Sequence, residues 1–454
     1  MLPNYSPWIS QLNRTRPVEP LPHDVKTDIA IVGGGIAGVS TAFFILKNTK
    51  KKVVLIEADK VAHGATGHNA GQIASYFERP FADMVKEFGL KLTAEAQDSI
   101  ETAWSLLDSM HHEAKLQTPV YRFTGHAGVC TFEQIMEHLE NNYLRVQSRI
   151  VDAEDILIAQ EAPYLSKIPT KYVGLYATVS HEYILSLLET NNRDFTAMIS
   201  FQKGCMNSAL FSEEVVGYLL ATYKDRFILF EGSPVKTIVL EKRKAYLKIL
   251  EHTVSAKRVI LCTNGFENFS IKNNAGKDID TKFHHTIEGN IGYMMAYFEP
   301  LFKSPTATSY LFRHGQDEPY FYLTRRMHEH QNPKAHSLVC IGGPEKKLPE
   351  RMTYVRQEEC DESMRKLVDD FLKKNYRNYR NEEFAFCWHG LMGYTPNRVR
   401  LIGPEPCNPV LLYNLGCNGV GILPSIYGGK RIADILAEIH LEPSIFDPKD
   451  QQRI

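Results

Sequence analysis

The sequence predicts an α/β fold built from more than one domain, and three observations support this. The chain has 454 residues, more than one small core requires. From Asp28 onward a strand, a helix and a second strand follow one another with short turns, as in a βαβ unit. Glycine-rich junctions of strand, loop and helix lie near both ends of the chain, so one site could be assembled from both.

Composition and charge exclude several kinds of partner. Hydrophobic residues make up 43% and charged residues 23% of the chain, which is typical of globular proteins. The formal net charge is -1, so no overall field attracts nucleic acid or an anionic membrane. The apolar stretch "IAIVGGGIAGVSTAFFIL" contains three consecutive glycines, which suit a strand, turn and helix better than a membrane span. The start of the chain lacks the pattern of a secretory signal, so we expect a cytoplasmic protein without a transmembrane segment.

The eight cysteines are scattered, without the C-x-x-C or cysteine–histidine spacing of a zinc site. Several lie in apolar strands, as in "VILCTNG" and "LVCIGG". We therefore expect buried free thiols, with neither a bound metal nor a disulfide framework.

Apolar periodicity assigns regular elements along the chain. An extended proline-rich arm, residues 1–24, precedes strand "DIAIVG", helix "GIAGVSTAFFILKN" and strand "KVVLIEAD". Helical spacing covers residues 81–118 and "TFEQIMEHLENNYLRVQS". A further series of strands begins near residue 227, and "EKRK", within this series, is expected to be a solvated turn. After 281 come strands "GYMMAYFEP", "PYFYLTRR" and "SLVCIGGPE", a charged helix near 356–375, strand "VLLYNLG" and the final helix "IYGGKRIADILAEI".

The first glycine-rich junction has the pattern of a dinucleotide-binding motif. "IVGGGIAGVS" places Gly33, Gly35 and Gly38 in the spacing G-x-G-x-x-G, with Ile36 and Ala37 at the start of the helix. The first glycine permits a tight turn, the second lets the backbone approach a pyrophosphate, and the third lets helix and strand pack closely. The N-terminus of the helix then faces the anion.

An acidic residue stands where the second strand ends. Glu57, followed by Ala58, lies about 20 residues beyond the motif, where a carboxylate accepts hydrogen bonds from an adenosine ribose. Strand, glycine loop, helix and acid together predict dinucleotide binding. The motif itself does not distinguish FAD from NAD.

Several segments together resemble one family of flavoproteins. They are "DIAIVGGGIAG", "LIEADKVAHGATGHNAGQ", "VILCTNG", "GLMGYTPNRVRLIGPEP" and "LGCNGVGI". In this order, over about residues 5–440, they are similar to the D-amino-acid oxidase, glycine oxidase and sarcosine oxidase superfamily. The similarity is greatest to its amine-oxidising branch, typified by gamma-glutamylputrescine oxidase.

This resemblance implies FAD as cofactor and an interleaved architecture. An FAD-binding Rossmann-like domain of the glutathione-reductase type would comprise residues 25–80, 195–270 and 385–440. An antiparallel-sheet substrate domain would comprise 81–194 and 271–384, with a C-terminal tail over 441–454.

The resemblance also implies which residues line the cofactor. Besides the motif, Glu57 and Ala58, we expect contacts from the loop after the second strand, from a later strand and turn, and from the C-terminal junction. The loop residues are Gly64, Ala65, Thr66, His68, Asn69, Ala70, Gly71 and Gln72; the others are Val235, Thr263, Asn264, Gly265, Gly390, Asn418, Gly419, Val420, Gly421 and Ile422. Backbone N–H groups and a helix N-terminus at the last junction would stabilise negative charge on a reduced flavin.

His68 has two interpretations. Relatives of the putrescine-oxidising type commonly have Arg at this place, and His68 would then contact the flavin without a covalent bond. Sarcosine and dimethylglycine dehydrogenases instead bond a histidine of a similar segment covalently to the flavin, and "GATGHNAG" matches that pattern. Non-covalent contact is favoured, because the chain lacks the folate-binding extension of those dehydrogenases.

The reaction implied by the resemblance is hydride transfer from a carbon bearing nitrogen to flavin N5, giving an imine that hydrolyses to an aldehyde. Amino-acid-oxidising relatives hold the substrate carboxylate with Arg where this chain has Met392, which favours an amine. Tyr320 and Tyr322 share one face of a strand; they belong either to the core of the sheet, which is favoured because aromatic residues are common in strands, or, with Met392 and Tyr394, to the substrate side. No catalytic acid or base is identified, although His284 and His285 are candidate basic groups.

Three hypotheses follow. The first is an FAD-dependent oxidoreductase acting on a small-molecule amine, gamma-glutamylputrescine-like or another alkylamine, with oxygen or a quinone as electron acceptor. The second is a D-amino-acid or glycine oxidase or dehydrogenase. The third is a non-catalytic flavin-binding assembly factor. The adjacent Arg325 and Arg326 could meet a distal substrate carboxylate, but solvent-exposed charge at a hairpin is the favoured interpretation.

Overall fold

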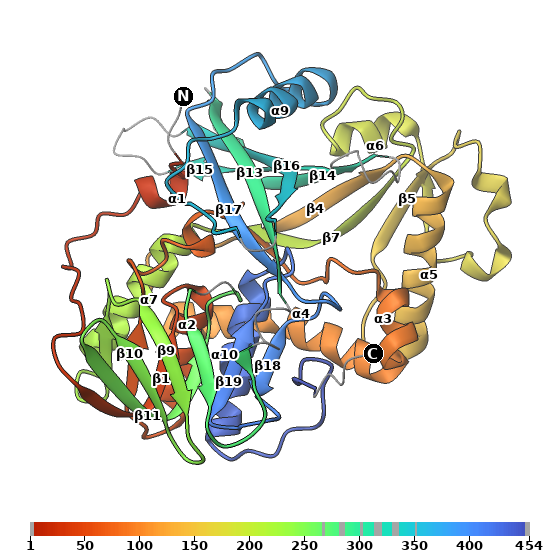
Figure 1. Ribbon diagram of the computed structural model, residues 1–454. Helices are drawn as coiled ribbons and strands as arrows, with labels where there is room; N and C mark the ends of the chain where they lie inside the picture. Colours follow the sequence, from red (N-terminus) through yellow and green to blue (C-terminus); the bar gives the residue numbers. More distant parts are fainter. Residues whose placement is uncertain are drawn as a thin grey trace.

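Two large β-sheets form the framework of the protein. The computed structural model describes residues 4–265, 268–280, 287–299, 303–312, 320–328, 336–349 and 352–449. Within these residues, one sheet has nine strands and the other has ten. In Figure 1 the nine-stranded sheet lies at the lower left and the ten-stranded sheet above it.

The nine-stranded sheet has a parallel centre. Its strand order is β12-β9-β10-β11-β1-β2-β8, with β19 beside β11 and β18 beside β19. β1 pairs in parallel with both β2 and β11, and the adjoining stretches 29–32, 53–56 and 259–261 are apolar and buried, as expected for strands covered on both faces. The strands are β1 (Val25–Val32), β2 (Val53–Ile56), β8 (Phe227–Phe230), β9 (Val235–Leu240), β10 (Ala245–Ile249), β11 (His252–Leu261), β12 (Ser270–Asn273), β18 (Leu401–Pro404) and β19 (Leu411–Leu415).

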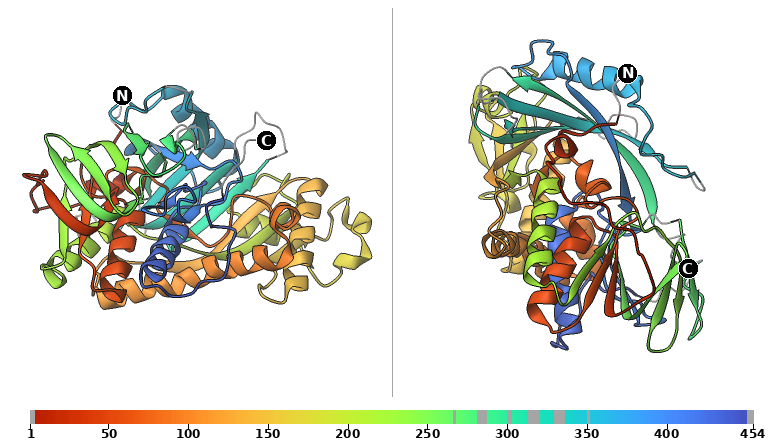
Figure 2. Two further views of the ribbon diagram at one scale, coloured as in Figure 1. Left: turned by 60° about the horizontal axis from the view of Figure 1, so that its bottom comes forward. Right: turned by 90° about the vertical axis from the view of Figure 1, so that its left-hand side faces the viewer.

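Helices from distant parts of the chain pack together beside this sheet. They are α2 (Ile36–Asn48), α4 (Leu90–Glu113), α7 (Ser208–Thr222) and α10 (Ile422–Leu436). α2 contacts both α7 and α10, and Figure 2 shows α4 running alongside α10. α2 and α10 approach closely because Gly429 has no side chain; a Cβ there would lie 2.8 Å from the Thr41 nitrogen. The first and last helices of the core are thus held together.

The ten-stranded sheet is mixed. Its order is β17-β13-β16-β15-β14-β4-β7-β5-β6, with β3 beside β7. Most pairs are antiparallel as predicted, but β14 with β4 and β5 with β6 are parallel. The strands are β3 (Gln72–Ala74), β4 (Tyr121–Val129), β5 (Asp155–Ala159), β6 (Ala177–Val179), β7 (Ala197–Cys205), β13 (Glu288–Glu299), β14 (Thr306–Leu311), β15 (Phe321–His328), β16 (His336–Lys347) and β17 (Phe386–Tyr394).

The remaining helices surround this second sheet. They are α1 (Pro7–Ser10), α3 (Phe81–Phe88), α5 (Phe132–Ser148), α6 (His181–Leu187) and α9 (Glu362–Asn375), with short 3-10 helices η1 (Ala65–Gly67), η2 (Leu165–Lys167) and η3 (Thr170–Tyr172). α9 lies against β13 and β16 at the top of Figure 1. No helix within the described residues is long and apolar enough to cross a membrane.

Most predicted elements are present, with shifts at their ends. The helical stretch 81–118 is divided into α3 and α4 at Gly89, whose φ of 83° is unfavourable for other residues. "EKRK" lies in the exposed turn between β9 and β10, as predicted. The charged helix begins later than expected, at Glu362, because Asp361 caps it by accepting a hydrogen bond from the Ser363 nitrogen.

Three strands cross the expected domain ranges. β3, β7 and β17 lie within residue ranges assigned to the cofactor domain, yet all three pair in the ten-stranded sheet. The discontinuous division into two domains therefore stays a prediction, with these strands as the segments that join the two sheets.

The expectation of free thiols is wrong for two cysteines. Cys360, just before α9, and Cys387, in β17, form a disulfide with a Cα–Cα distance of 6.0 Å. Only the fold brings them together, because they are 27 residues apart and belong to no recognisable spacing motif. Cys205, Cys262 and Cys340 are buried free thiols, as predicted. Within the described residues no cluster of three or more His, Cys, Asp or Glu side chains is arranged to hold a metal ion.

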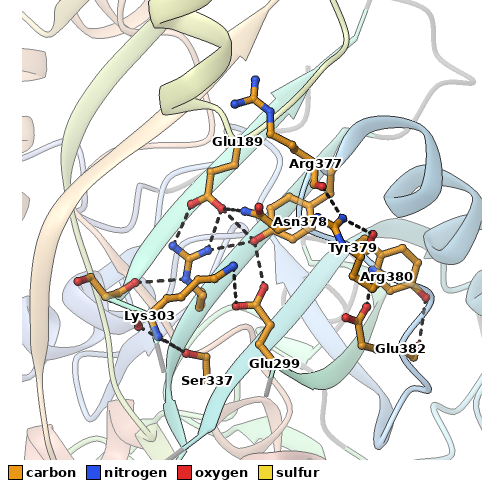
Figure 3. Close-up of polar contacts among 12 residues, drawn as sticks. Glu189, Glu299, Lys303, Ser337, Arg377, Asn378, Tyr379, Arg380 and Glu382 are labelled. Atoms are coloured by element: carbon orange, nitrogen blue, oxygen red, sulfur yellow. Dashed lines mark hydrogen bonds and ion pairs between the residues drawn. The ribbon is translucent and has the colours of Figure 1, made fainter. Parts of the chain in front are cut away.

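The expectation for Arg325 and Arg326 is also wrong, because both side chains are buried in β15. Arg325 donates two hydrogen bonds to the Glu189 carboxylate, at 2.8 and 2.9 Å. Tyr376 joins this pair through its hydroxyl, 3.0 Å from the guanidinium. Figure 3 shows Glu189 at the centre of this network, with Asn378 beside it and Glu299 and Lys303 opposite. Arg326 instead lies 4.9 Å from the centre of the Trp8 ring.

We predict that Glu189→Gln lowers the free energy of unfolding by about 3 kcal/mol at pH 7, because it leaves a buried guanidinium without its counter-charge. Burial tends to raise the Glu189 pKa, but Arg325 outweighs burial and the pKa is lowered overall. The pair therefore stabilises the fold above the unfolded-state pKa of about 4.3 and loses this effect as pH falls through the folded-state pKa. Urea unfolding at pH 7 and pH 4 measures both effects.

The matched control is Glu182→Gln, which removes an exposed ion pair with Arg193 and should leave the urea midpoint unchanged. Equal stability of Glu189→Gln and the unmodified protein at pH 7 would contradict the assignment.

Candidate functional site

A cavity of about 590 Å³ opens where the central parallel strands end. Val32 at the end of β1 is paired with Ile56 in β2 and with Leu261 in β11. The residues that follow these strand ends, Gly33, Glu57 and Cys262, therefore meet at one edge and line the cavity. The opposite wall comes from the ten-stranded sheet, through β13, β15, β16 and β17. The cavity is thus enclosed between the two sheets.

The glycine motif forms the sharp turn that the sequence predicts. Gly33 has φ of 108°, and a Cβ there would lie 2.6 Å from the Cys262 oxygen. A Cβ on Gly38 would lie 1.8 Å from the Gly33 oxygen, so only glycine lets α2 approach the turn. Gly35 is the N-cap of α2 and offers no side chain to the first turn. The positive end of α2 therefore faces the cavity.

Glu57 joins the end of β2 to the glycine loop. Its Oε2 accepts a hydrogen bond from the Gly34 nitrogen at 2.7 Å, and its Oε1 accepts one from the Asp59 nitrogen at 2.9 Å. Burial raises the Glu57 pKa, although both backbone hydrogen bonds oppose this. A carboxylate with free acceptor positions is thus held at the cavity wall, as a ribose-binding residue requires.

The loop after β2 is held by its own hydrogen bonds. Thr66 Oγ1 accepts from the Ile36 nitrogen at 2.9 Å, which attaches the loop to the start of α2. Asn69 donates to Ser208 Oγ at 2.8 Å, and its backbone oxygen accepts from the indole nitrogens of Trp8 and Trp388. Although Asn69 lines the cavity, its amide group bonds within the protein.

The loop glycines have different roles. A Cβ on Gly71 would lie 2.7 Å from the Trp8 ring, and one on Gly67 would lie 2.5 Å from Ile9 Cδ1. These two glycines therefore serve packing against the N-terminal arm. A Cβ on Gly64 would meet nothing within 4 Å, and this residue lines the cavity.

His68 is a neutral imidazole in the cavity wall. Its Nδ1 lies 3.0 Å from the Gly64 oxygen, and because a carbonyl only accepts, Nδ1 donates this bond. Burial lowers the His68 pKa to about 4, so the ring is uncharged at neutral pH with Nε2 unprotonated. A Cβ on Gly390 of β17 would lie 2.6 Å from the His68 oxygen, so glycine is required where β17 passes this loop.

The C-terminal junction reaches the same cavity, which confirms the prediction that both glycine-rich junctions meet. Asn418 has φ of 48° and connects the loop to β17, donating from its backbone nitrogen to the Gly393 oxygen at 2.9 Å. Its Oδ1 accepts from the Thr395 nitrogen at 2.8 Å. Gly421 caps α10, whose N-terminus therefore also faces the cavity.

Two carboxylates and three tyrosines line another part of the cavity. The carboxylates are Glu78 and Glu345, and the tyrosines are Tyr76, Tyr320 and Tyr322. Glu78 lies over Gly419: a Cβ on that glycine would be 2.9 Å from Glu78 Oε1. Burial raises the pKa of Glu78 to about 7 and also raises that of Glu345. Burial likewise raises the pKa of all three phenols.

Glu78 differs from Glu57 and Glu345 in its lack of hydrogen bonds. Within the described part of the chain, no donor reaches its carboxylate, and only the charges of Lys203 and Arg398 favour ionisation. Glu345 accepts one hydrogen bond from Asn290 at 3.2 Å. An unpaired carboxylate inside a protein is costly unless a ligand compensates it.

Lys203 lies behind this group of residues. Its side chain is almost fully buried in β7, and its Nζ is 3.3 Å from Gln72 Oε1 and 3.5 Å from Ser309 Oγ. Burial lowers the Lys203 pKa to about 8. Sequence reasoning missed Lys203, Glu78 and Glu345, since no motif or spacing distinguishes them from surface charges.

Most residues predicted for the site do line the cavity. They are Gly33, Gly35, Ile36, Ala37, Glu57, Ala58, Gly64, Ala65, Thr66, His68, Asn69, Ala70, Gln72, Val235, Thr263, Asn264, Tyr320, Tyr322, Gly390, Met392, Gly419, Val420, Gly421 and Ile422. Gly38, Gly71, Gly265, Asn418 and Tyr394 do not line it. His284 and His285 lie outside the described residues.

Two arginines also line the cavity, and both have partners within the protein. Arg356 donates to the His63 oxygen at 2.7 Å and pairs with Asp59. Arg400 donates to the side chain and backbone oxygens of Asn414, at 2.7 and 2.9 Å. Sequence reasoning missed both residues as well.

The fold and the cavity are typical of proteins that bind a dinucleotide at the end of a parallel sheet. The family model of FAD-dependent oxidoreductases, DAO, matches residues 28–185 and 194–435. The chain therefore belongs to this family of FAD-dependent oxidoreductases.

Individual relatives are more distant. Gamma-glutamylputrescine oxidoreductase of Escherichia coli is 31% identical over 83 residues, which is 18% of this chain and 19% of that protein. A putative Rieske 2Fe-2S iron-sulfur protein of Bacillus subtilis is 30% identical over 109 residues, 23% of this chain and 21% of that one. These matches thus span about a fifth of each relative.

Solved structures share the fold over nearly the whole chain. Glycine oxidase from Geobacillus kaustophilus has a TM-score of 0.67 at 14% identity, covering 94% of this chain and 100% of that one. L-alpha-glycerophosphate oxidase from Mycoplasma pneumoniae, with FAD bound, has a TM-score of 0.62 at 15% identity, covering 90% and 94%. At these identities the likeness concerns the fold alone.

The described residues fit FAD. Two helix N-termini face the cavity, and an acidic residue stands at the end of β2. Glycines in the cavity lining would let the backbone approach the cofactor closely. The free space beside Gly64 also suits a bound cofactor, because a side chain at this position would occupy the cavity.

We predict that Gly64→Leu weakens FAD binding without unfolding the apoprotein. The Gly64 φ of -82° suits any residue and its Cβ has free space, so the new side chain fills part of the cavity in which we expect FAD to bind. FAD affinity, measured by fluorescence titration of the apoprotein, should fall at least about tenfold, or about 1.4 kcal/mol. The control is Gly217→Leu, at an exposed position of α7 that also has free space. Unchanged affinity in Gly64→Leu would refute the cofactor position.

Proposed function

We propose that this protein oxidises the C–N bond of a cationic alkylamine. When bound, FAD would supply the hydride acceptor. After the ammonium proton has passed to the Glu78 carboxylate, the carbon bearing the neutral amine would lose a hydride, and water would hydrolyse the resulting imine to an aldehyde. The single observation that supports this best is Glu78, a carboxylate without hydrogen bonds in the cavity wall. An ammonium group placed there would supply the direct hydrogen-bonded partner that Lys203 and Arg398, which act only through their charges, do not provide.

The tyrosines around Glu78 support the same substrate class. Tyr320 and Tyr322 lie with ring centres 5.6 Å apart, and both rings line the cavity, as does Tyr76. Tyrosine faces attract cations and cover methylene groups at the same time. These rings would exclude water from the reacting carbon and orient the amine.

A carboxylate-bearing substrate is less well matched. Met392, at the position where amino-acid-oxidising relatives have Arg, lines the cavity and cannot pair with a carboxylate. Arg356 and Arg400 are already bonded to acceptors of the protein. Glu78 and Glu345 would repel a substrate carboxylate. The amine therefore fits better than a D-amino acid or glycine.

We further propose that the flavin is held without a covalent bond. The neutral His68 ring is fixed by its hydrogen bond to Gly64, which orients it as a contact residue.

We predict that Glu78→Gln lowers kcat/KM for butylamine at least about tenfold, equivalent to about 1.4 kcal/mol of transition-state stabilisation. In the unmodified enzyme kcat/KM should rise with pH through about 7, because burial raises the Glu78 pKa to about 7 and only the carboxylate attracts the ammonium. The pKa of Glu78 depends on its burial and on the charges of Glu345, Lys203 and Arg398. The variant should lose this limb of the profile.

Anaerobic reduction of the flavin by butylamine, glycine and D-alanine, followed by absorbance across pH 6 to 9, measures both effects. Glu95→Gln, on the surface of α4, is the matched control. Reduction by D-alanine or glycine with no reduction by amines would overturn the proposed function.

We predict that acid precipitation releases all the flavin into the supernatant. A covalent bond to His68 would keep the colour in the protein pellet, because acid unfolding does not break it. Absorbance of both fractions, with flavin fluorescence of the denatured protein on a gel, provides the measurement. A yellow pellet whose colour is lost in His68→Ala would establish the covalent alternative instead.

A further inference from the structure

A second cavity, of about 250 Å³, adjoins the first. Tyr76, Glu78, Ser309 and Tyr320 line both cavities, so these side chains form their common boundary. The second cavity extends from them toward α3, α4 and α5. A ligand with one end at Glu78 therefore has a second compartment directly beyond it.

The second cavity contains another carboxylate without hydrogen bonds. Glu154, just before β5, lines it, and burial raises the Glu154 pKa. The backbone of Glu154 is fixed by Asn142, whose side chain bonds its nitrogen at 2.8 Å and its oxygen at 2.7 Å. Within the described residues no donor bonds the carboxylate itself, and Arg145 acts on it only through its charge. The backbone of Glu154 is thus fixed by two hydrogen bonds, and its carboxylate lines the second cavity as that of Glu78 lines both.

The cations in the second cavity are already engaged. Arg145 donates to Glu101 Oε1 at 2.8 Å and to the Asp152 oxygen at 2.6 Å. Arg79 pairs with Glu87 at 2.5 Å and donates to the Asn397 oxygen at 3.1 Å. His138 and Glu137 also line the cavity. A ligand carboxylate would therefore compete with existing acceptors, whereas a ligand ammonium would meet Glu154 directly.

We infer that the second cavity binds the distal ammonium of a diamine or polyamine substrate. The inference rests on the proposed function: Glu78 would hold the cationic end nearer the flavin, and Glu154 the end farther from it. Tyr76 lies near enough to both carboxylates for each to raise its pKa, and Tyr76 and Tyr320 line both cavities, where they would cover the methylene chain. The aromatic rings of Phe81 and Phe201 add apolar surface on the far side. The substrate class is accordingly a free diamine, not one whose distal nitrogen is capped by an acyl group.

Steady-state kinetics of the holoenzyme test this inference. For the unmodified enzyme, kcat/KM should be at least tenfold higher with 1,4-diaminobutane or spermidine than with butylamine or N-acetyl-1,4-diaminobutane. Glu154→Gln should raise KM for the diamines at least tenfold while leaving kcat/KM for butylamine within twofold. The control is Glu161→Gln, an exposed carboxylate of the same region, which should change neither value. A uniform loss with both substrates would refute the role of Glu154.

A measurement on the unmodified enzyme covers the case in which Glu154→Gln does not fold. In a series of diamines from three to eight carbons, KM should pass through a minimum at one length, while monoamines of the same lengths should show none. If monoamines and diamines are oxidised equally well, or the acylated diamine or gamma-glutamylputrescine is preferred, the subsite inference fails and the proposed function stands. If no amine reduces the flavin, the proposed function itself fails.

Discussion

The parallel pairing of β1 with β2 and β11 is the constraint on which the rest of the structure depends. Because the three strands end at the same level, the glycine turn, Glu57 and the Cys262–Thr263 turn meet at one edge. α2 starts at that edge, and the close contact at Gly429 brings α10 and its glycine loop to the same place. A shift of one residue in either pairing would separate these parts, so the cavity is a consequence of strand register.

Carboxylates inside the protein fall into two groups. Glu57 accepts two backbone hydrogen bonds, and Glu189 has Arg325 and Tyr376 as partners. Glu231 likewise pairs with Arg14 and Arg16. In the part of the chain that the structure describes, Glu78 and Glu154 lack such hydrogen bonds, and both line cavities.

This contrast supports a role in binding for the second group. A protein that satisfies its structural carboxylates has no folding reason to leave others unpaired beside open space. The same reasoning explains why tyrosines surround Glu78, since their faces stabilise a cation without competing for its counter-charge.

The sequence predicted the cofactor side of the site much better than its substrate side. Gly33, Gly38 and Glu57 act through local geometry, so their spacing already contains the information. Glu78 and Glu345 come from separate segments that only the tertiary fold places together. Tyr320 and Tyr322 were found through strand alternation, since their neighbour Phe321 packs into the core instead.

The departures from expectation have physical causes as well. Gly71 does not line the cavity, because the N-terminal arm packs Trp8 against it, and nothing in the local sequence indicates that contact. The local sequence around Arg325 is typical of a surface charge, yet Glu189, just after α6, neutralises the charge of the buried guanidinium. The Cys360–Cys387 disulfide depends on the position of α9 over the sheet. In each case a long-range contact overrides a local pattern.

The proposed function requires a cation site beside the flavin. Titration of the holoprotein with tetramethylammonium, which cannot form an imine, tests for this site without turnover. We expect a saturable change in the flavin absorption spectrum with tetramethylammonium that is lost in Glu78→Gln, and none with acetate at equal ionic strength. A saturable change with acetate and none with the cation would contradict this expectation.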